Sequence, residues 1–279
     1  MLAQALRRSG PYMCCAALPA VLLFAPASYG AEEFPGPFEA TYTLYSTGTR
    51  IATMQRRLSR SEDGRYLYES KTDAAGLLAL FRKDHITERS VWEFAESGPR
   101  SRSYLYERSG GSADRTVQVS FDWASGFITN TVNGSTWQMP LQPEMMDKLL
   151  YQLAIMFDLE SGKESLHYII ADGGKTKIYR FYRLGEEVID TPLGRLRTVK
   201  LQRDKPNSRR DSTLWCAIGL HFLPVKVENV EKSGKVTTAV ISGLQGFDAA
   251  GIALLRERTR AMAPSQSSLS AVSSSSTDM

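Results

Sequence analysis

The sequence predicts a mainly β fold, in which a large curved antiparallel meander, a half-barrel or a barrel, wraps around one main amphipathic helix. Two observations favour the meander: from Phe38 onward apolar residues alternate with polar ones, and turn-forming residues separate the alternating runs. A third observation places the helix, because one central segment has apolar residues three and four positions apart. A long meander rarely stays flat, so we expect it to curl or close around this helix.

The first half of the chain has the clearest alternation. The first strand begins at Phe38, and the second, Ile51–Leu58, has Ala52, Met54 and Leu58 on one face, opposite Gln55 and Arg57. The pair Asp63-Gly64 predicts a hairpin turn after it. Further strands are expected at Tyr66–Ser70, Ile86–Phe94, Arg102–Arg108, Thr116–Trp123, Phe127–Val132 and Ser135–Met139.

The helix is predicted over Pro143–Gly162. Pro143 suits a first helical turn and Gly162 suits a stop. Its apolar positions are Met146, Leu149, Leu150, Leu153, Met156 and Phe157. We expect this stripe to face the concave side of the sheet. Met146, Leu150 and Leu153 are therefore candidate ligand-binding residues.

Strands are expected to resume after the helix, which gives about a dozen short strands in all. They are Leu166–Ala171, Ile178–Leu184, Leu196–Arg203, Thr213–Ala217, Val225–Glu231 and Val236–Ser242. Residues 31–250 are therefore predicted to form a single β-rich domain. Residues 251–279 are predicted to be a weak helix followed by a disordered, serine-rich tail.

The N-terminus has the order of features that is typical of a Sec-type signal peptide. Arg7 and Arg8 form a positive head, Met13–Ala25 is apolar, and small residues lead to Gly30 before polarity returns. We expect residues 1–30 to be removed and the mature protein to be periplasmic. No later segment reaches the ~20 apolar residues that a membrane span needs, so no transmembrane span is expected in the mature chain.

Charge and cysteine content exclude some classes of protein. The chain has a net charge of +4, and the loss of Arg7 and Arg8 leaves +2. This near-neutral balance does not support nucleic-acid binding. Outside the signal peptide Cys216 is the one cysteine, so we expect no internal disulfide and a buried, unreactive thiol.

The sequence gives little indication of a metal site or a catalytic site. The three histidines lie far apart, so neither a metal site nor a cofactor is expected; they are His85, His167 and His221. Glu186, Glu187 and Asp190 cluster before the Thr191-Pro192 turn, and two further acidic residues, Asp147 and Asp158, lie in the predicted helix. Nothing in the sequence places two of these carboxylates across a cleft, as a glycosidase requires. We therefore expect a protein that is not an enzyme.

Several short motifs follow one another in a specific order. They are Asp147-Lys148-Leu149, Asp158-Leu159, Gly185-Glu186-Glu187, Thr191-Pro192-Leu193-Gly194, Thr198-Val199-Lys200-Leu201, Trp215 and Phe222-Leu223-Pro224-Val225. Over most of Phe38–Gly246 this order resembles a family of exported bacterial proteins, the domain of unknown function 3108. Ala52 departs from the pattern, because the family tends to have glycine there. The resemblance implies an envelope protein with no catalytic residue to carry over, and a shape similar to that of periplasmic lipoprotein carriers.

Two segments are candidates for ligand contact. An apolar stretch before Arg82-Lys83 predicts either a short core helix or a mobile lip at which a lipid chain enters; its candidate binding residues are Leu77, Leu78, Leu80 and Phe81. The second segment is the basic loop Arg203–Arg210. Such a loop is either only solvated or binds anionic headgroups or phosphates by charge attraction.

Three functions fit these features. The first is a periplasmic binding protein that carries or senses a lipid, a lipoprotein or another apolar ligand on the concave face of the sheet. The second is an envelope assembly or scaffold factor that binds another protein, for example by strand addition. An enzyme that acts on envelope polymers comes third. A continuous apolar pocket would favour the first, a solid core the second, and a polar cleft with facing carboxylates the third.

Overall fold

The structure is a computed structural model and describes residues 36–76, 84–111, 113–204 and 211–247. All of these residues belong to one compact unit that begins at Pro35. The predicted signal peptide, the predicted weak helix and the serine-rich tail lie outside the described residues. The same holds for Leu77, Leu78, Leu80 and Phe81 and for residues 205–210 of the basic loop.

The alternation in the first half of the chain produces eight strands. They are β1 (Phe38–Ser46), β2 (Thr49–Arg60), β3 (Tyr66–Ala74), β4 (His85–Ala95), β5 (Gly98–Ser109), β6 (Arg115–Asp122), β7 (Phe127–Val132) and β8 (Ser135–Pro140). Each strand pairs antiparallel with the next one. Asn133 and Gly134, which join β7 to β8, have φ angles of 48° and 87°, as a type I′ hairpin turn requires.

The second half contributes seven further strands and the helix. These elements are β9 (Met146–Asp147), α2 (Tyr151–Glu160), β10 (Leu166–Ala171), β11 (Thr176–Thr191), β12 (Gly194–Asp204), β13 (Asp211–Ala217), the 3₁₀ turn η1 (Ile218–Leu220), β14 (Leu223–Val230) and β15 (Val236–Gln245). Consecutive strands pair antiparallel again, except that β9 runs parallel to β10.

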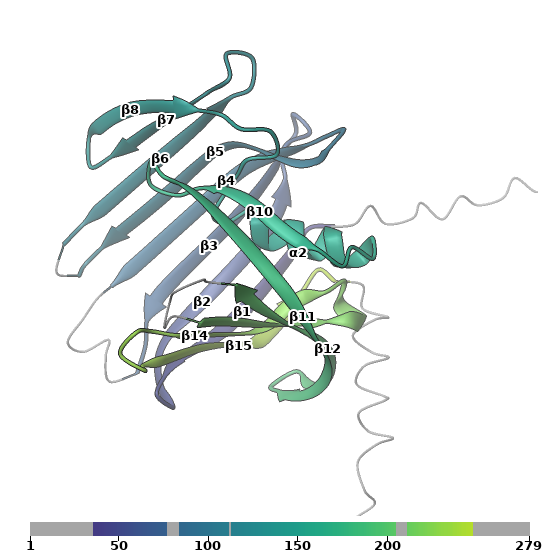
Figure 1. The fold of residues 1–279 in the computed structure, drawn as a ribbon. Helices are drawn as coiled ribbons and strands as arrows, with labels where there is room; N and C mark the ends of the chain where they lie inside the picture. The colour runs from purple at the N-terminus through teal and green to yellow at the C-terminus, as the bar shows by residue number, and fades with distance from the viewer. Residues whose placement is uncertain (1–35, 77–83, 112, 205–210, 248–279) are drawn as a thin grey trace, which may run out of the picture. The chain divides into compact units, whose positions relative to one another are not determined.

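All fifteen strands form one sheet, in the order β8 to β1, then β15 to β9. The first and last strands therefore pair at its centre, and its two edges, β8 and β9, come from the middle of the chain. The sheet is not closed, and Figure 1 shows it curving around α2. The predicted mainly β, antiparallel fold with one main helix is confirmed, with more strands than expected.

The predicted limits and character of the helix are wrong. Helix α2 begins at Tyr151 instead of Pro143, and Met146 lies in strand β9. The helix is also not amphipathic, because apolar side chains surround it on nearly every side; the buried ones are Leu153, Ala154, Ile155, Met156 and Leu159. A helix that is apolar all round belongs in the interior, and α2 fills the concave side of the sheet.

A buried carboxylate explains the late start of the helix. Asp147 is completely buried, and its Oδ1 accepts hydrogen bonds of 2.8 Å from the backbone N–H groups of Leu149 and Leu150. Its Oδ2 accepts bonds of 2.6 Å from the hydroxyls of Ser90 on β4 and Ser101 on β5. Asp147 thus ties β9 and the start of α2 to the concave face of β4 and β5. Burial raises the pKa of Asp147, and these four hydrogen bonds act in the opposite direction.

Replacing Leu153 with alanine tests the packing of α2. The side chain is 0% exposed, so Leu153→Ala should lower the free energy of unfolding by about 2–5 kcal/mol, measured by denaturant titration. The control is Glu160→Ala at the exposed end of the helix, for which a change within about 0.5 kcal/mol is expected. Equal effects of the two changes would contradict a core position for α2.

Two substitutions at Asp147 separate the charge from the hydrogen bonds. Asp147→Ala leaves two backbone N–H groups and two hydroxyls without an acceptor, so we expect a loss of about 3–5 kcal/mol in the free energy of unfolding. Asp147→Asn should lose clearly less, because its amide oxygen keeps the two N–H bonds and the serine hydroxyls can turn to accept from its amide nitrogen. If both variants were equally unstable, the charge would matter more than the acceptors.

Candidate functional site

A cavity of about 280 Å³ lies on the concave side of the sheet, next to the start of α2. Both halves of the chain line it, since β2 and β4 contribute on one side and β11 to β14 on the other. The lining residues are Arg56, Glu88, Lys148, Tyr151, Gln152, Tyr179, Phe181, Arg203, Ser212, Leu214, Val227 and Asn229. The cavity therefore combines aromatic rings with three cationic side chains.

Arg56 comes from the buried row of β2. Alternate residues of this strand, Ala52, Met54, Arg56 and Leu58, point inward and are buried, and Arg56 is only 8% exposed. Its guanidinium lies 5.5 Å from the ring centroid of Tyr42, and its Nε is buried without a hydrogen-bond partner. The second strand was correctly predicted, but position 56 was not assigned to either face. Strict period-two alternation would have found this inward arginine.

Arg203 enters the cavity from β12, two positions beyond the buried Leu201. The sequence predicts Arg203 both at the end of a strand and at the start of the basic loop, and the structure places it within β12. Its guanidinium stacks on the ring of Tyr179, 3.2 Å from the centroid, and its Nε is also buried without a partner. Such stacking fixes the plane of the guanidinium and leaves its edges available for hydrogen bonds.

The other two charged residues of the cavity neutralise each other. The Nζ of Lys148 lies 3.4 Å from Oε1 of Glu88, and the hydroxyl of Tyr104 donates a 2.6 Å hydrogen bond to the same oxygen. The ammonium group also lies 4.6 Å from the ring centroid of Tyr106. Among the described residues, by contrast, Arg56 and Arg203 form no ion pair with a carboxylate.

Aromatic rings form the wall of the cavity beside α2. Tyr151, in the first turn of the helix, stacks against Phe181 with ring centroids 6.2 Å apart, and it meets Tyr179 edge-on at 5.1 Å. Burial and the nearby Tyr179 raise the pKa of Tyr151, so its hydroxyl stays neutral at physiological pH.

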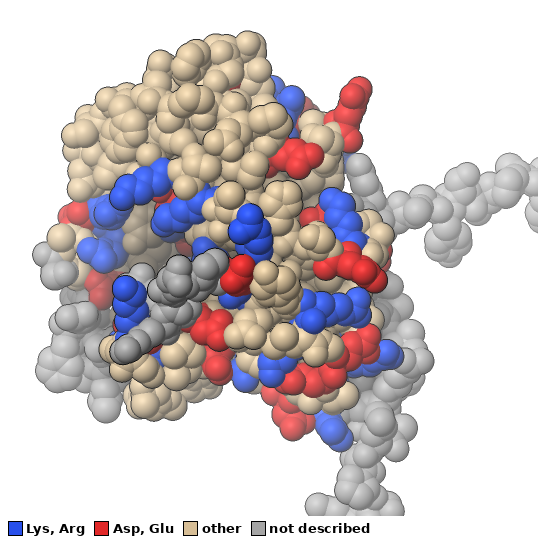
Figure 2. All heavy atoms as spheres, in the orientation of Figure 1, with Lys and Arg blue, Asp and Glu red and all other residues tan. Residues whose placement is uncertain are grey.

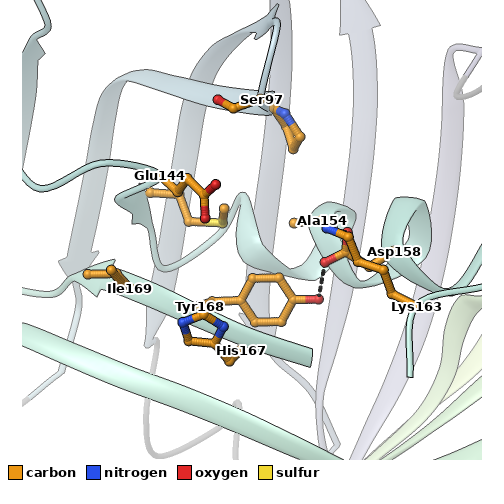
Figure 3. A pocket seen from close by; sticks show the side chains of 10 residues that line it. Ser97, Glu144, Ala154, Asp158, Lys163, His167, Tyr168 and Ile169 are labelled. Atoms are coloured by element: carbon orange, nitrogen blue, oxygen red, sulfur yellow. Dashed lines mark hydrogen bonds and ion pairs between the residues drawn. The ribbon is translucent and has the colours of Figure 1, made fainter. Parts of the chain in front are cut away.

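A second hollow, of about 70 Å³, is too small for more than a few water molecules. It lies beside α2 and includes Glu144, Asp158 and His167 (Figure 3). The hydroxyl of Tyr168 donates a 2.9 Å hydrogen bond to Oδ2 of Asp158, and Lys163 Nζ lies 2.7 Å from Oδ1. Both oxygens of Asp158 are therefore occupied, and Glu144 stands apart from this pair in Figure 3.

The predicted ligand-binding residues of the helix segment lie in the core. Leu150 and Leu153 are 0% exposed and do not line the 280 Å³ cavity, while Met146 is 7% exposed and borders the small hollow. The apolar stretch around Leu78 lies outside the described residues. The cavity is thus neither a continuous apolar pocket nor a cleft with facing carboxylates.

The histidines and Cys216 occupy separate places. His85 contacts Asp73 and Thr87 at the sheet surface, and His221 lies 3.4 Å from Glu160. Among the residues that the structure describes, no group of three or more His, Cys, Asp or Glu side chains comes together as a metal site. Cys216 is completely buried, and burial raises the pKa of its thiol, so it is not poised as a thiolate nucleophile.

Several motif residues meet on the outer face of the sheet instead. Trp215 lies between the ammonium groups of Lys200 and Lys226, which are 5.0 and 4.1 Å from its ring centroid. Its Nε1 donates to Glu187, and Lys200 Nζ lies 3.3 Å from the same carboxylate. The Trp215 bond, together with Lys200, lowers the pKa of Glu187. This cluster joins β11, β12, β13 and β14.

None of the described helices is both long enough and apolar enough to cross a membrane. No curated protein matches the chain. The fold is similar to the crystal structure of a beta-barrel-like protein of domain of unknown function DUF1849 from Brucella abortus, with a TM-score of 0.53 and 7% sequence identity. That match covers 76% of this chain and 98% of the other, and at this identity it concerns the fold alone.

A family match agrees with the order of motifs in the sequence. Residues 39–240 match the family described as protein of unknown function (DUF3108), and the chain therefore belongs to this family.

Proposed function

We propose that the protein is a periplasmic binding protein that holds an amphiphilic ligand, such as a lipid or the lipid part of a lipoprotein, on the concave face of its sheet. The observation that carries the proposal is the 280 Å³ cavity inside the curved sheet. Ligand pockets commonly combine aromatic walls with a few polar groups that orient the ligand. The cavity meets this description in part: Tyr151, Tyr179 and Phe181 form an aromatic wall, but charged and polar residues make up more of its lining than in a continuous apolar pocket, which suits the polar end of an amphiphile.

The N-terminal sequence supports the proposed periplasmic location of the protein. A positive head, an apolar run and small residues before Ala31 support export by the Sec route, with cleavage after Gly30. A soluble carrier of apolar molecules is useful in the periplasm, because lipids and lipoproteins must cross an aqueous space there. Binding, and no catalytic step, is the proposed activity.

Filling the cavity with a larger side chain should weaken ligand binding. Val227 lines the cavity on β14, so Val227→Trp should weaken the binding of a fluorescent acyl probe about tenfold or more, measured by titration. Val230→Trp, on the same strand but with its side chain on the opposite face, is the matched control and should bind like wild type. A wild-type protein that binds no acyl probe, or a Val227→Trp variant that binds normally, would contradict the proposal.

A second candidate function is partner binding by strand addition. Strand β8 is an edge of the sheet, it is exposed along most of its length, and it lies in a segment, Trp123–Pro143, without a single charged residue. Figure 2 shows a surface over β7 and β8 that is nearly free of charged side chains. Natural edge strands usually carry charges or proline that prevent pairing. Strand β8 has no charge, and its one proline, Pro140, is its last residue, so the edge from Ser135 to Met139 supports the assembly-factor alternative.

Strand addition at β8 can be tested by photocrosslinking in cells. In a hairpin with a two-residue turn, Ser135 and Trp137 face β7 with their N–H groups, so the N–H of Gln138 points away from the sheet. A photocrosslinker at Thr136 should give one discrete crosslinked protein. Gln138→Pro should remove this product and Gln138→Thr should keep it. Crosslinking that is insensitive to Gln138→Pro would exclude strand addition.

A further inference from the structure

We infer that the concave cavity binds an anionic group, a carboxylate or a phosphate, and that Arg56 and Arg203 are the residues that hold it. The inference rests on the proposed function and extends it by naming the chemistry of one end of the ligand. It follows from the balance of charge in the cavity, the burial of Arg56 and the orientation of Arg203.

The charges that line the cavity do not balance. Three cationic residues, Arg56, Lys148 and Arg203, face one carboxylate, that of Glu88. Glu88 already receives Lys148 at 3.4 Å and the hydroxyl of Tyr104 at 2.6 Å. The two arginines therefore leave the cavity with an excess of positive charge that the lining itself does not compensate.

Arg56 is buried in a way that normally requires a counter-charge. The residue is 8% exposed, and the Nε of its guanidinium is fully enclosed without a partner. A guanidinium stays protonated in proteins, so burial does not neutralise it. Its aromatic neighbours do not supply a negative charge, because burial raises the pKa of both Tyr42 and Tyr68 and keeps their phenols neutral.

Arg203 is oriented for the same kind of partner. Tyr179 holds the face of its guanidinium at 3.2 Å, so the N–H donors along the edge of the group are the ones left for a ligand. Its Nε is buried in the cavity wall without an acceptor. Planar guanidinium groups bind carboxylate and phosphate oxygens in a bidentate manner, which makes two arginines on one cavity a suitable receptor for either group.

A purely structural role for Arg56 and a role in anion binding predict opposite effects of Arg56→Met on the melting temperature. If Tyr42 and Tyr68 were the reason for its presence, then Arg56→Met would lower the melting temperature. If its role is to bind an anion, then Arg56→Met removes a buried charge whose nearest carboxylate, Glu88, is already paired with Lys148, and the melting temperature of the ligand-free protein should stay equal or rise. The neighbouring Arg57 is exposed on the other face of β2, so Arg57→Met is a matched control.

The experiment compares two probes that differ only in charge, using protein purified from cells that express the full chain. Wild type should bind a dansyl-labelled fatty acid about tenfold more tightly than its methyl ester. Arg56→Met and Arg203→Met should each bring the two affinities close together by weakening the acid alone, and Arg57→Met should keep the difference. Competition by inorganic phosphate then distinguishes a free anion, which would displace the acid, from an amphiphile headgroup, which would resist displacement.

The outcomes separate this inference from the proposed function. Equal affinity of wild type for acid and ester, without phosphate binding, would overturn the anion site and leave the acyl carrier in place. Phosphate binding that depends on Arg56, with neither acyl probe bound, would support the anion site and overturn the acyl carrier. A lower melting temperature of Arg56→Met with an unchanged preference for the acid would also overturn the inference.

Discussion

The interaction on which the rest of the structure depends is the set of hydrogen bonds around Asp147. The sheet does not close, and its edge β9 is two residues long, too short to fix its own position through backbone pairing. The side chain of Asp147 supplies the missing attachment, because it binds β4 and β5 with one oxygen and the backbone before α2 with the other. A buried carboxylate is stable only when its acceptors are satisfied, so this arrangement tolerates little displacement.

The cavity is a direct result of this attachment. Because α2 begins where Asp147 fixes it, Tyr151 and Gln152 in the first turn face the rings and arginines of the opposite strands. Further along the helix the side chains are enclosed, and the interior there is a packed core. The concave face is thus divided into an apolar part packed around the rest of the helix and a charged part around the cavity. Natural proteins keep such a departure from an apolar interior mainly where a binding or catalytic role requires it.

Sequence alone predicted the sheet well and the charged cavity poorly. Alternation is a local signal, so strands such as β2 and β7 were found nearly at their observed limits. The start of the helix was missed because the decisive partners of Asp147, Ser90 and Ser101, lie 57 and 46 residues away. Arg56 went unassigned because a charged residue in a buried row contradicts the pattern that identifies the strand. Arg203, which lines the same cavity, is distant in sequence, and no local pattern connects the two residues.

The pairing of the first strand with the last sets a condition on how the chain can fold. Tyr42 and Ile241 are partners in the β1–β15 ladder, and the hydroxyl of Tyr42 donates to the carbonyl of Pro224, 182 residues further along. One edge of β1 therefore has no native partner until residues 236–245 are available to pair with it. Closing so long a loop is entropically costly and slow, and an unpaired strand edge is prone to aggregate during the delay. A chaperone that holds the unfolded chain would protect the unpaired edge of β1 until β15 pairs with it. Because of this topology, the chain is most prone to aggregate in the stage before its first and last strands pair.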